Sequence, residues 1–178
     1  MLRKMKINKY FLGIVLIIII IMYFMAGVLF LGNTREDNNM KVSTVQQSIE
    51  YQTFKSETEG YNLASKYAEN LQNNSLDKEA IDLQLQEAKK FLQDNIKGIS
   101  RESDNFAQMF YYCGIIYGLD DIYNCGDYEF VKVGIEVRKY IIKVQNGDMD
   151  DELEADLYDK LTKLTADDIQ EVVNAIDN

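Results

Sequence analysis

Apolar side chains follow two different patterns along this chain. Residues 11–31 contain no charged side chain and would be apolar on every side of a helix: FLGIVLIIIIIMYFMAGVLFL. At about 1.5 Å of rise per residue, a helix over this stretch is about 31 Å long, which matches a hydrocarbon core about 30 Å thick. We therefore expect residues 11–31 to form a transmembrane helix that contacts the lipid bilayer.

After the span, apolar residues recur every three or four positions, which is the period of an amphipathic α-helix. The pattern predicts helices over residues 40–58 and 61–73, interrupted at Gly60 because glycine weakens a helix interior. The clearest helix is expected to have Ser75 as its N-cap and Gly98 as its stop. Its apolar stripe consists of Ile81, Leu85, Ala88, Leu92 and Ile96.

The next predicted helix starts at Ser103 or Asp104 and ends within residues 118–124. Its aromatic and apolar residues cover more than one face, so we expect it to be the central, most buried helix. A further helix follows Gly126 and ends at residues 146–147. It carries an a/d seam of two heptads, formed by Phe130, Gly134, Val137, Ile141 and Val144.

Two short acidic helices are expected at the end of the chain. The second should be capped by Thr165, with Asp168 three residues later. No stretch alternates with period two long enough to predict a half-buried strand. The expected fold class is therefore all-α: an N-terminal transmembrane helix followed by one compact helical domain of about five to seven helices.

The tail before the span predicts the orientation of the chain. Residues 1–10 contain four basic residues and no acidic one, and such an excess is typical of the cytoplasmic side of a span. We expect a cytoplasmic tail at residues 1–10, a juxtamembrane linker at residues 32–39 and an extracytoplasmic domain at residues 40–178. The predicted location is the cell membrane, with a single pass.

A cleaved secretory signal is the alternative interpretation of the same N-terminal segment. Its apolar region normally covers about 7 to 15 residues and ends at a small-x-small cleavage site. Here the apolar run is longer, and Phe30 stands where a small side chain is needed. An uncleaved anchor fits the sequence better.

Charge limits the classes of partner. Four of the 19 Lys and Arg residues lie in the N-terminal tail, whereas all 29 Asp and Glu residues lie beyond it, so residues 33–178 carry a net charge of −14. This charge disfavours nucleic acid as a partner. An acidic surface also keeps an exported domain soluble, which is a sufficient reason for the charge by itself.

The absence of histidine from the sequence excludes several chemistries. Ser-His-Asp and Cys-His catalysis both need an imidazole, as do the His-containing zinc sites. We therefore expect no cofactor-binding residues and assign no catalytic residues.

Cys113 and Cys125 are the only cysteines. Outside the cytoplasm an even number of cysteines favours a disulfide. A straight helix would separate the two residues by about 18 Å, so a bridge requires the chain to turn back near residues 118–121. A disulfide between Cys113 and Cys125 is predicted, with two buried free thiols as the alternative.

A cluster of carboxylates near the C-terminus suggests calcium at first sight. The EF-hand loop needs Gly at its sixth and Glu at its twelfth position. Counted from Asp148, these positions are Leu153 and Asp159, and counted from Asn146 they are Asp151 and Leu157. We expect no metal site, and interpret the first carboxylates as favouring the positive end of a helix.

The pair Glu102-Ser103, at the start of an aromatic-rich helix, resembles the Glu-Ser pair at the catalytic acid of lytic transglycosylases, which cut cell-wall glycan. The resemblance implies a carboxyl whose pKa is raised by an apolar pocket. It covers two residues only, because DNFAQMFYY follows where that family has a Gly-rich stretch ending in Met-Gln. Helix capping by Ser103 with an exposed Glu102 is the simpler interpretation.

Tyrosine is abundant, with 12 residues in the chain. Tyr side chains fill cores and are also enriched in protein–protein contacts. The sequence thus favours a non-catalytic domain that binds a protein or cell-envelope partner, in an accessory, sensor or immunity-type role. A cell-wall-directed hydrolase or lytic enzyme is the alternative, and the oligomeric state stays open.

Overall fold

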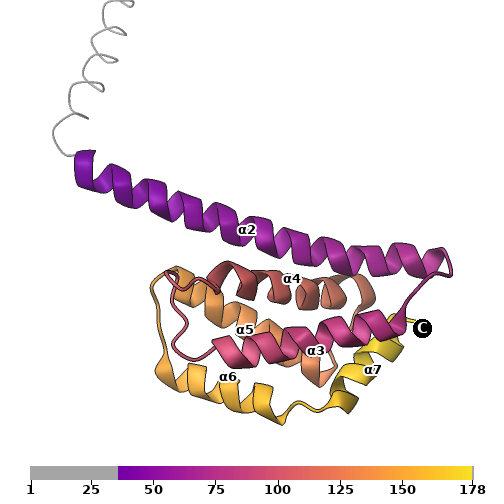
Figure 1. Cartoon of the computed structure of the whole chain (residues 1–178). Coiled ribbons are helices and arrows are strands. Elements are labelled where there is room, and N and C mark those ends of the chain that lie inside the picture. Colours follow the sequence, from indigo (N-terminus) through magenta and orange to yellow (C-terminus); the bar gives the residue numbers. More distant parts are fainter. Residues whose placement is uncertain (1–35, 178) are drawn as a thin grey trace, which may run out of the picture. The chain divides into compact units, whose positions relative to one another are not determined.

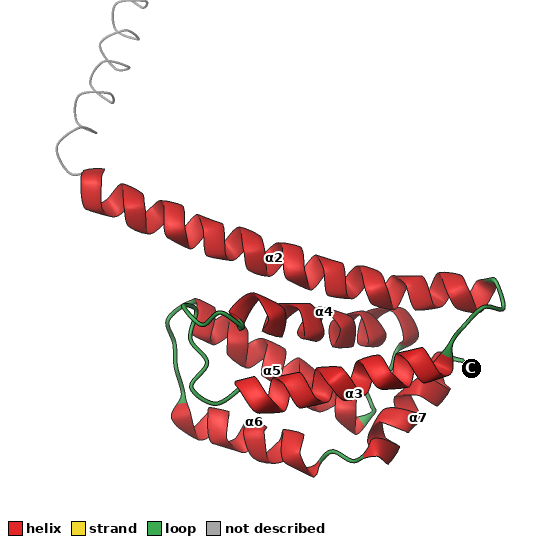
Figure 2. Cartoon of the chain, in the orientation of Figure 1, coloured by secondary structure: helices red, strands yellow, loops and turns green. Residues whose placement is uncertain are grey.

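The computed structural model describes residues 36–177, which form six α-helices and no strand. This confirms the predicted all-α class for the described part of the chain (Figure 2). The helices, labelled in Figure 1, are α2 (Glu36–Gln72), α3 (Lys78–Asn95), α4 (Phe106–Tyr123), α5 (Glu129–Gln145), α6 (Asp151–Lys163) and α7 (Ala166–Ile176).

The predicted transmembrane helix at residues 11–31 lies outside the described residues. Within residues 36–177, no helix combines the length and the apolar character that crossing a membrane requires. The chain divides into two units, Met1–Gln46 and Gln47–Asn178. The second unit holds the core, and it contains the last part of α2 together with α3 to α7.

The predicted apolar stripes of α3 and α5 are confirmed. All five stripe residues of α3 are buried, and so are the five a/d residues of α5. Gly98 and Gly147 follow the two helices with positive φ values of 66° and 83°. A left-handed residue at this place ends a helix, and glycine adopts it without a Cβ penalty.

Helix α4 is the most buried helix, as predicted. Half of its 18 residues are buried, and its neighbours include α2, α3 and α5. The contact with α5 depends on Gly134, because a Cβ there would lie 2.5 Å from Cδ1 of Ile116. The glycine at this a/d position therefore lets the two helices approach closely.

The capping box of α7 is also confirmed. The Thr165 side chain accepts a hydrogen bond from the backbone N–H of Asp168, and the Asp168 carboxylate accepts one from the backbone N–H of Thr165. The hydrogen bonds from Thr165 lower the pKa of Asp168. Both groups thereby satisfy backbone donors that the first helical turn leaves unpaired.

The predicted interruption at Gly60 is wrong. Helix α2 runs through Gly60 without a break, and it begins at Glu36, inside the predicted linker. Glycine is needed at position 60 because of its tertiary packing against α4. A Cβ at Gly60 would lie 2.0 Å from the backbone oxygen of Tyr111, so the missing side chain lets α2 cross α4 at backbone contact.

The predicted N-cap of α3 is wrong by two residues. Asp77 is the N-cap, and its carboxylate accepts the backbone N–H of Ala80 at 3.0 Å. Ser75 instead helps to end α2, since its N–H donates to the carbonyl of Asn70 at 2.8 Å. Asn74 between them has φ 51°, so these residues form a Schellman motif.

Candidate functional site

Helix α2 packs on α4 through small residues. A Cβ added to Gly114 would lie 2.2 Å from the backbone oxygen of Glu57, and one added to Gly118 would lie 2.6 Å from the Cβ of Ala64. Together with Gly60, these residues form a Gly-x-x-x-Ala pattern on α2 facing a Gly-x-x-x-Gly pattern on α4. The helices therefore approach too closely to leave room for larger side chains.

Polar contacts join α2 to α5. The Arg138 guanidinium forms a half-buried ion pair with Glu57, and its carbon lies 4.7 Å from the centre of the Tyr117 ring on α4. One turn earlier on α2, the buried Thr53 hydroxyl accepts a hydrogen bond from the Gln145 amide at 2.9 Å. The inner side of α2 is thus held by small and polar groups along residues 53–64 and by the buried Tyr67 beyond them.

Aromatic residues gather on the other side of α2 and at its border with α4. Tyr51 and Phe54 are 67% and 68% exposed, which is unusual for side chains of this size. Phe54 and Tyr61 are seven residues apart and so lie on the same side of the helix. The Tyr61 ring is 6.0 Å from that of Tyr117, which is 36% exposed. We call these four residues the α2 aromatic surface.

Acidic groups border the α2 aromatic surface. The Tyr61 hydroxyl donates to the Asp121 carboxylate at 2.7 Å, which raises the pKa of Tyr61. Two cations beside this surface are paired with carboxylates: Arg138 with Glu57, and Lys55 with Glu59 at 3.8 Å. These pairs cancel, and Asp121 leaves the five named groups with a sum of −1, the same sign as the whole domain.

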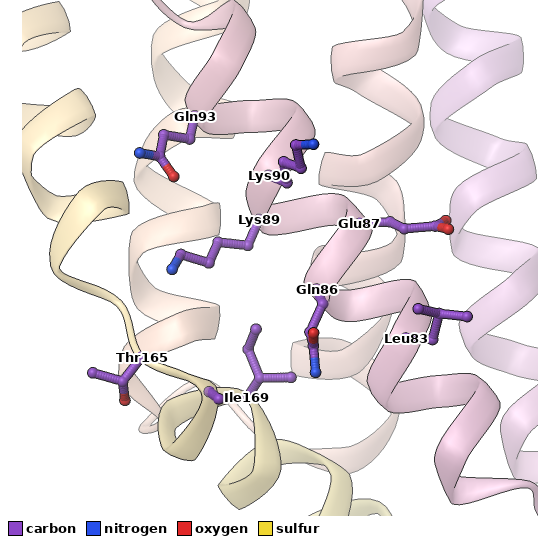
Figure 3. A pocket seen from close by; sticks show the side chains of 9 residues that line it. Leu83, Gln86, Glu87, Lys89, Lys90, Gln93, Thr165 and Ile169 are labelled. Atoms are coloured by element: carbon purple, nitrogen blue, oxygen red, sulfur yellow. The ribbon is translucent and has the colours of Figure 1, made fainter.

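A shallow groove of about 450 Å³ lies between α3 and the start of α7. In Figure 3, Lys89 points from α3 toward the segment before α7. The Lys89 ammonium donates to the carbonyl of Leu164. This lysine is therefore held by the protein's own backbone.

Glu102 has the wrong surroundings for a catalytic acid. It lies in the loop before α4 and is exposed, and its carboxylate accepts a hydrogen bond from Arg101 at 2.9 Å. This bond lowers the pKa of Glu102, whereas a general acid at neutral pH needs a raised pKa. Ser103 does not cap α4, whose N-cap is Asn105.

Cys113 and Cys125 are both buried, and both are free thiols in the structure. Burial raises the pKa of each thiol. The turn that a disulfide requires near residues 118–121 is missing from α4, which continues to Tyr123. The disulfide stays a prediction, and it would need the last turns of α4 to unwind. Two free thiols after denaturation without reductant would contradict it.

The carboxylates near the C-terminus lie at the start of α6 and stabilise its first turn. Asp150 is the N-cap of this helix and accepts the backbone N–H of Leu153 at 3.0 Å. Three more acidic residues occupy the first turn, where the helix dipole favours negative charge. Among residues 36–177, no group of three or more Cys, Asp or Glu side chains is placed to hold a metal ion.

No known protein family, curated protein or solved structure matches this chain.

Proposed function

We propose that this chain is a membrane-anchored, non-catalytic binding protein. Its extracytoplasmic helical domain binds a protein or cell-envelope partner through the α2 aromatic surface, in an accessory, sensor or immunity-type role. The apolar run at residues 11–31 and the basic tail before it support the anchor and its orientation.

The exposure of Tyr51 and Phe54 is the observation that carries the proposal. Single exposed apolar residues are common, but grouped aromatic residues are typical of interfaces. Tyr and Arg are also enriched among the residues that dominate binding energy, and Arg138 lies against Tyr117 at the edge of the same surface. The surface lies on the exposed sides of two helices, and small ligands prefer clefts, so a macromolecule is the better-suited partner.

Site-specific photo-crosslinking in intact cells tests the binding surface. A photoreactive phenylalanine analogue replaces Phe54 in the full chain, and in a control chain it replaces Leu83, which is 60% exposed on α3. We expect one discrete adduct from position 54, weakened by Tyr51→Ala, and no such adduct from position 83. Equal adducts at both positions, or none at position 54, would refute the binding surface.

A separate experiment tests the location of the domain. One new cysteine is placed near Asn178 in a variant without Cys113 and Cys125, and intact cells are treated with a membrane-impermeant thiol reagent. We expect labelling without lysis. Protection that ends only on lysis would reject the extracytoplasmic location, while leaving the crosslinking result to decide on the surface itself.

A further inference from the structure

We infer that the partner presents a cationic amphipathic segment to the α2 aromatic surface. The inference rests on the proposed function and adds the chemical class of the partner. The segment combines apolar side chains, which cover Tyr51 and Phe54, with Lys or Arg side chains, which meet the acidic border of the surface.

Charge complementarity is the first argument. Beside the surface, Glu57 is paired with Arg138 and Glu59 with Lys55, which leaves Asp121 as the carboxylate that holds no cation and gives these five groups a sum of −1. Residues 33–178 as a whole carry a net charge of −14. A cationic partner is attracted by both the local and the overall field, which speeds association and suppresses acidic competitors.

The chemistry of the rings is the second argument. The face of an aromatic ring attracts a cation, and this domain uses that attraction twice internally. Arg138 lies over Tyr117 at 4.7 Å, and the Lys97 ammonium lies over Tyr158 at 3.4 Å. The rings of Tyr51 and Phe54 are more exposed than Tyr117, so they can receive Lys or Arg side chains from another molecule.

The negative charge of the domain disfavours two other possible partners for the α2 aromatic surface. A second copy of the chain would bring two domains of charge −14 together, and among the described residues Arg138 and Lys55 are each already paired with a carboxylate of the same domain. An anionic lipid surface would be repelled for the same reason. A cationic protein segment is the occupant that gains from both the rings and the carboxylates.

Binding of two designed helical peptides tests the inference. They share the same leucine positions, and the remaining positions are lysine in one peptide and glutamate in the other. The full chain is held in nanodiscs of zwitterionic lipid, with empty nanodiscs as the blank, and affinity is measured by fluorescence anisotropy. We expect the lysine peptide to bind at least about tenfold more tightly, and the difference to shrink as salt is added.

Matched variants separate binding at the surface from general attraction to an acidic protein. The double variant Tyr51→Ala/Phe54→Ala should bind the lysine peptide about tenfold more weakly, while Leu83→Ala should bind it as the wild type does. All three side chains are exposed, so none of the substitutions should disturb folding; circular dichroism checks this. Equal affinity for the two peptides, or an unchanged double variant, would overturn the inference.

The outcomes also distinguish the inference from the proposed function. If the adduct at position 54 forms but the lysine peptide has no advantage, the surface binds a partner and the cationic class is wrong. If light scattering shows a dimer that the double variant loses, the partner is a second copy, and the inference is again wrong. If position 54 gives no adduct, the proposed function fails as well.

Discussion

The substitution Gly114→Ala tests the close crossing of α2 and α4. In an isolated helix this change is favourable by about 1 kcal/mol, because alanine has a much higher helix propensity than glycine. In this fold, the new Cβ would lie 2.2 Å from the carbonyl oxygen of Glu57. A Cβ atom in a protein essentially never lies within 3.0 Å of another heavy atom, so a separation of 2.2 Å is a steric clash.

The size of the expected destabilisation depends on which atoms can move to relieve the clash. The obstructing atom belongs to the backbone, so a change of side-chain rotamer cannot relieve the clash, and α2 must shift by about 1 Å. Overpacking of this kind costs about 1 to 3 kcal/mol, and a backbone obstacle belongs at the upper end of that range. After the gain in propensity is subtracted, Gly114→Ala should lower the free energy of unfolding by about 2 kcal/mol.

Urea denaturation followed by circular dichroism at 222 nm measures this effect in the full chain, kept in mild detergent. The control is Asn62→Ala, at an exposed position of α2, which should be neutral or slightly stabilising. Gly60→Ala should behave like Gly114→Ala, because its Cβ would lie 2.0 Å from the oxygen of Tyr111. The double variant should lose less than the sum of the two, since one shift of α2 relieves both clashes. A neutral or stabilising effect of Gly114→Ala would refute the close crossing.

Three further predictions concern the cap of α7 and the buried thiol of Cys113. Thr165→Ala should lower the free energy of unfolding by about 1 kcal/mol, with an unchanged denaturant slope, because it removes the N-cap side chain. Because the Thr165 hydrogen bonds lower the pKa of Asp168, stability from this carboxylate is present above its ordinary pKa and is lost as the pH falls through the lowered value. Asp168→Asn should therefore reduce the loss of stability in that acidic range, and an unchanged pH profile would contradict the role of the carboxylate. In the reduced native chain, Cys113 should not react with iodoacetamide at neutral pH, because it is buried and its pKa is raised; reaction without unfolding would contradict its burial.

The periodic helices could be predicted from the sequence because their signals are local. In α3 the apolar residues recur at helical spacing, and Gly98 adopts the left-handed conformation after the helix. The Thr165 and Asp168 capping box needs only residues three positions apart. Each of these features depends on neighbours along the chain, so a single sequence contains the whole signal.

The errors occur where the deciding partner is distant in sequence or where two local signals compete. Gly60 weakens a helix in isolation, but its packing partner is the backbone at Tyr111, on a helix that begins more than thirty positions later. Ser75 and Asp77 are both good N-cap residues, and only the end of α2, which uses the N–H of Ser75, decides between them. The predicted exposure of Glu102 is confirmed, although the cap expected at Ser103 is wrong because Asn105 is the N-cap of α4.

The α2 aromatic surface could be predicted from the sequence only in part. In the helix predicted over residues 40–58, the apolar stripe consists of Val42, Val45 and Ile49. Tyr51 and Phe54 fall outside this stripe, so the pattern alone places them on the polar side of the helix. Their exposure depends on which side of α2 packs against α4. That side is set by Gly60 together with Gly114 and Gly118 of α4, and the sequence analysis interpreted Gly60 as an interruption of the helix.

The composition of the two sides of α2 argues that the exposed aromatic residues are not needed for the fold. Burying a large apolar side chain contributes about 1.5 to 3 kcal/mol, yet the inner side of α2 places Thr53, Gly60 and Ala64 against the core. Small residues there let the helices touch, and the hydrogen bond to Gln145 fixes the position of the helix. With the docking of α2 explained in this way, folding provides no reason for two large aromatic side chains on its outer side. The proposed binding function would provide one, because the same side chains would be buried when a partner covers them.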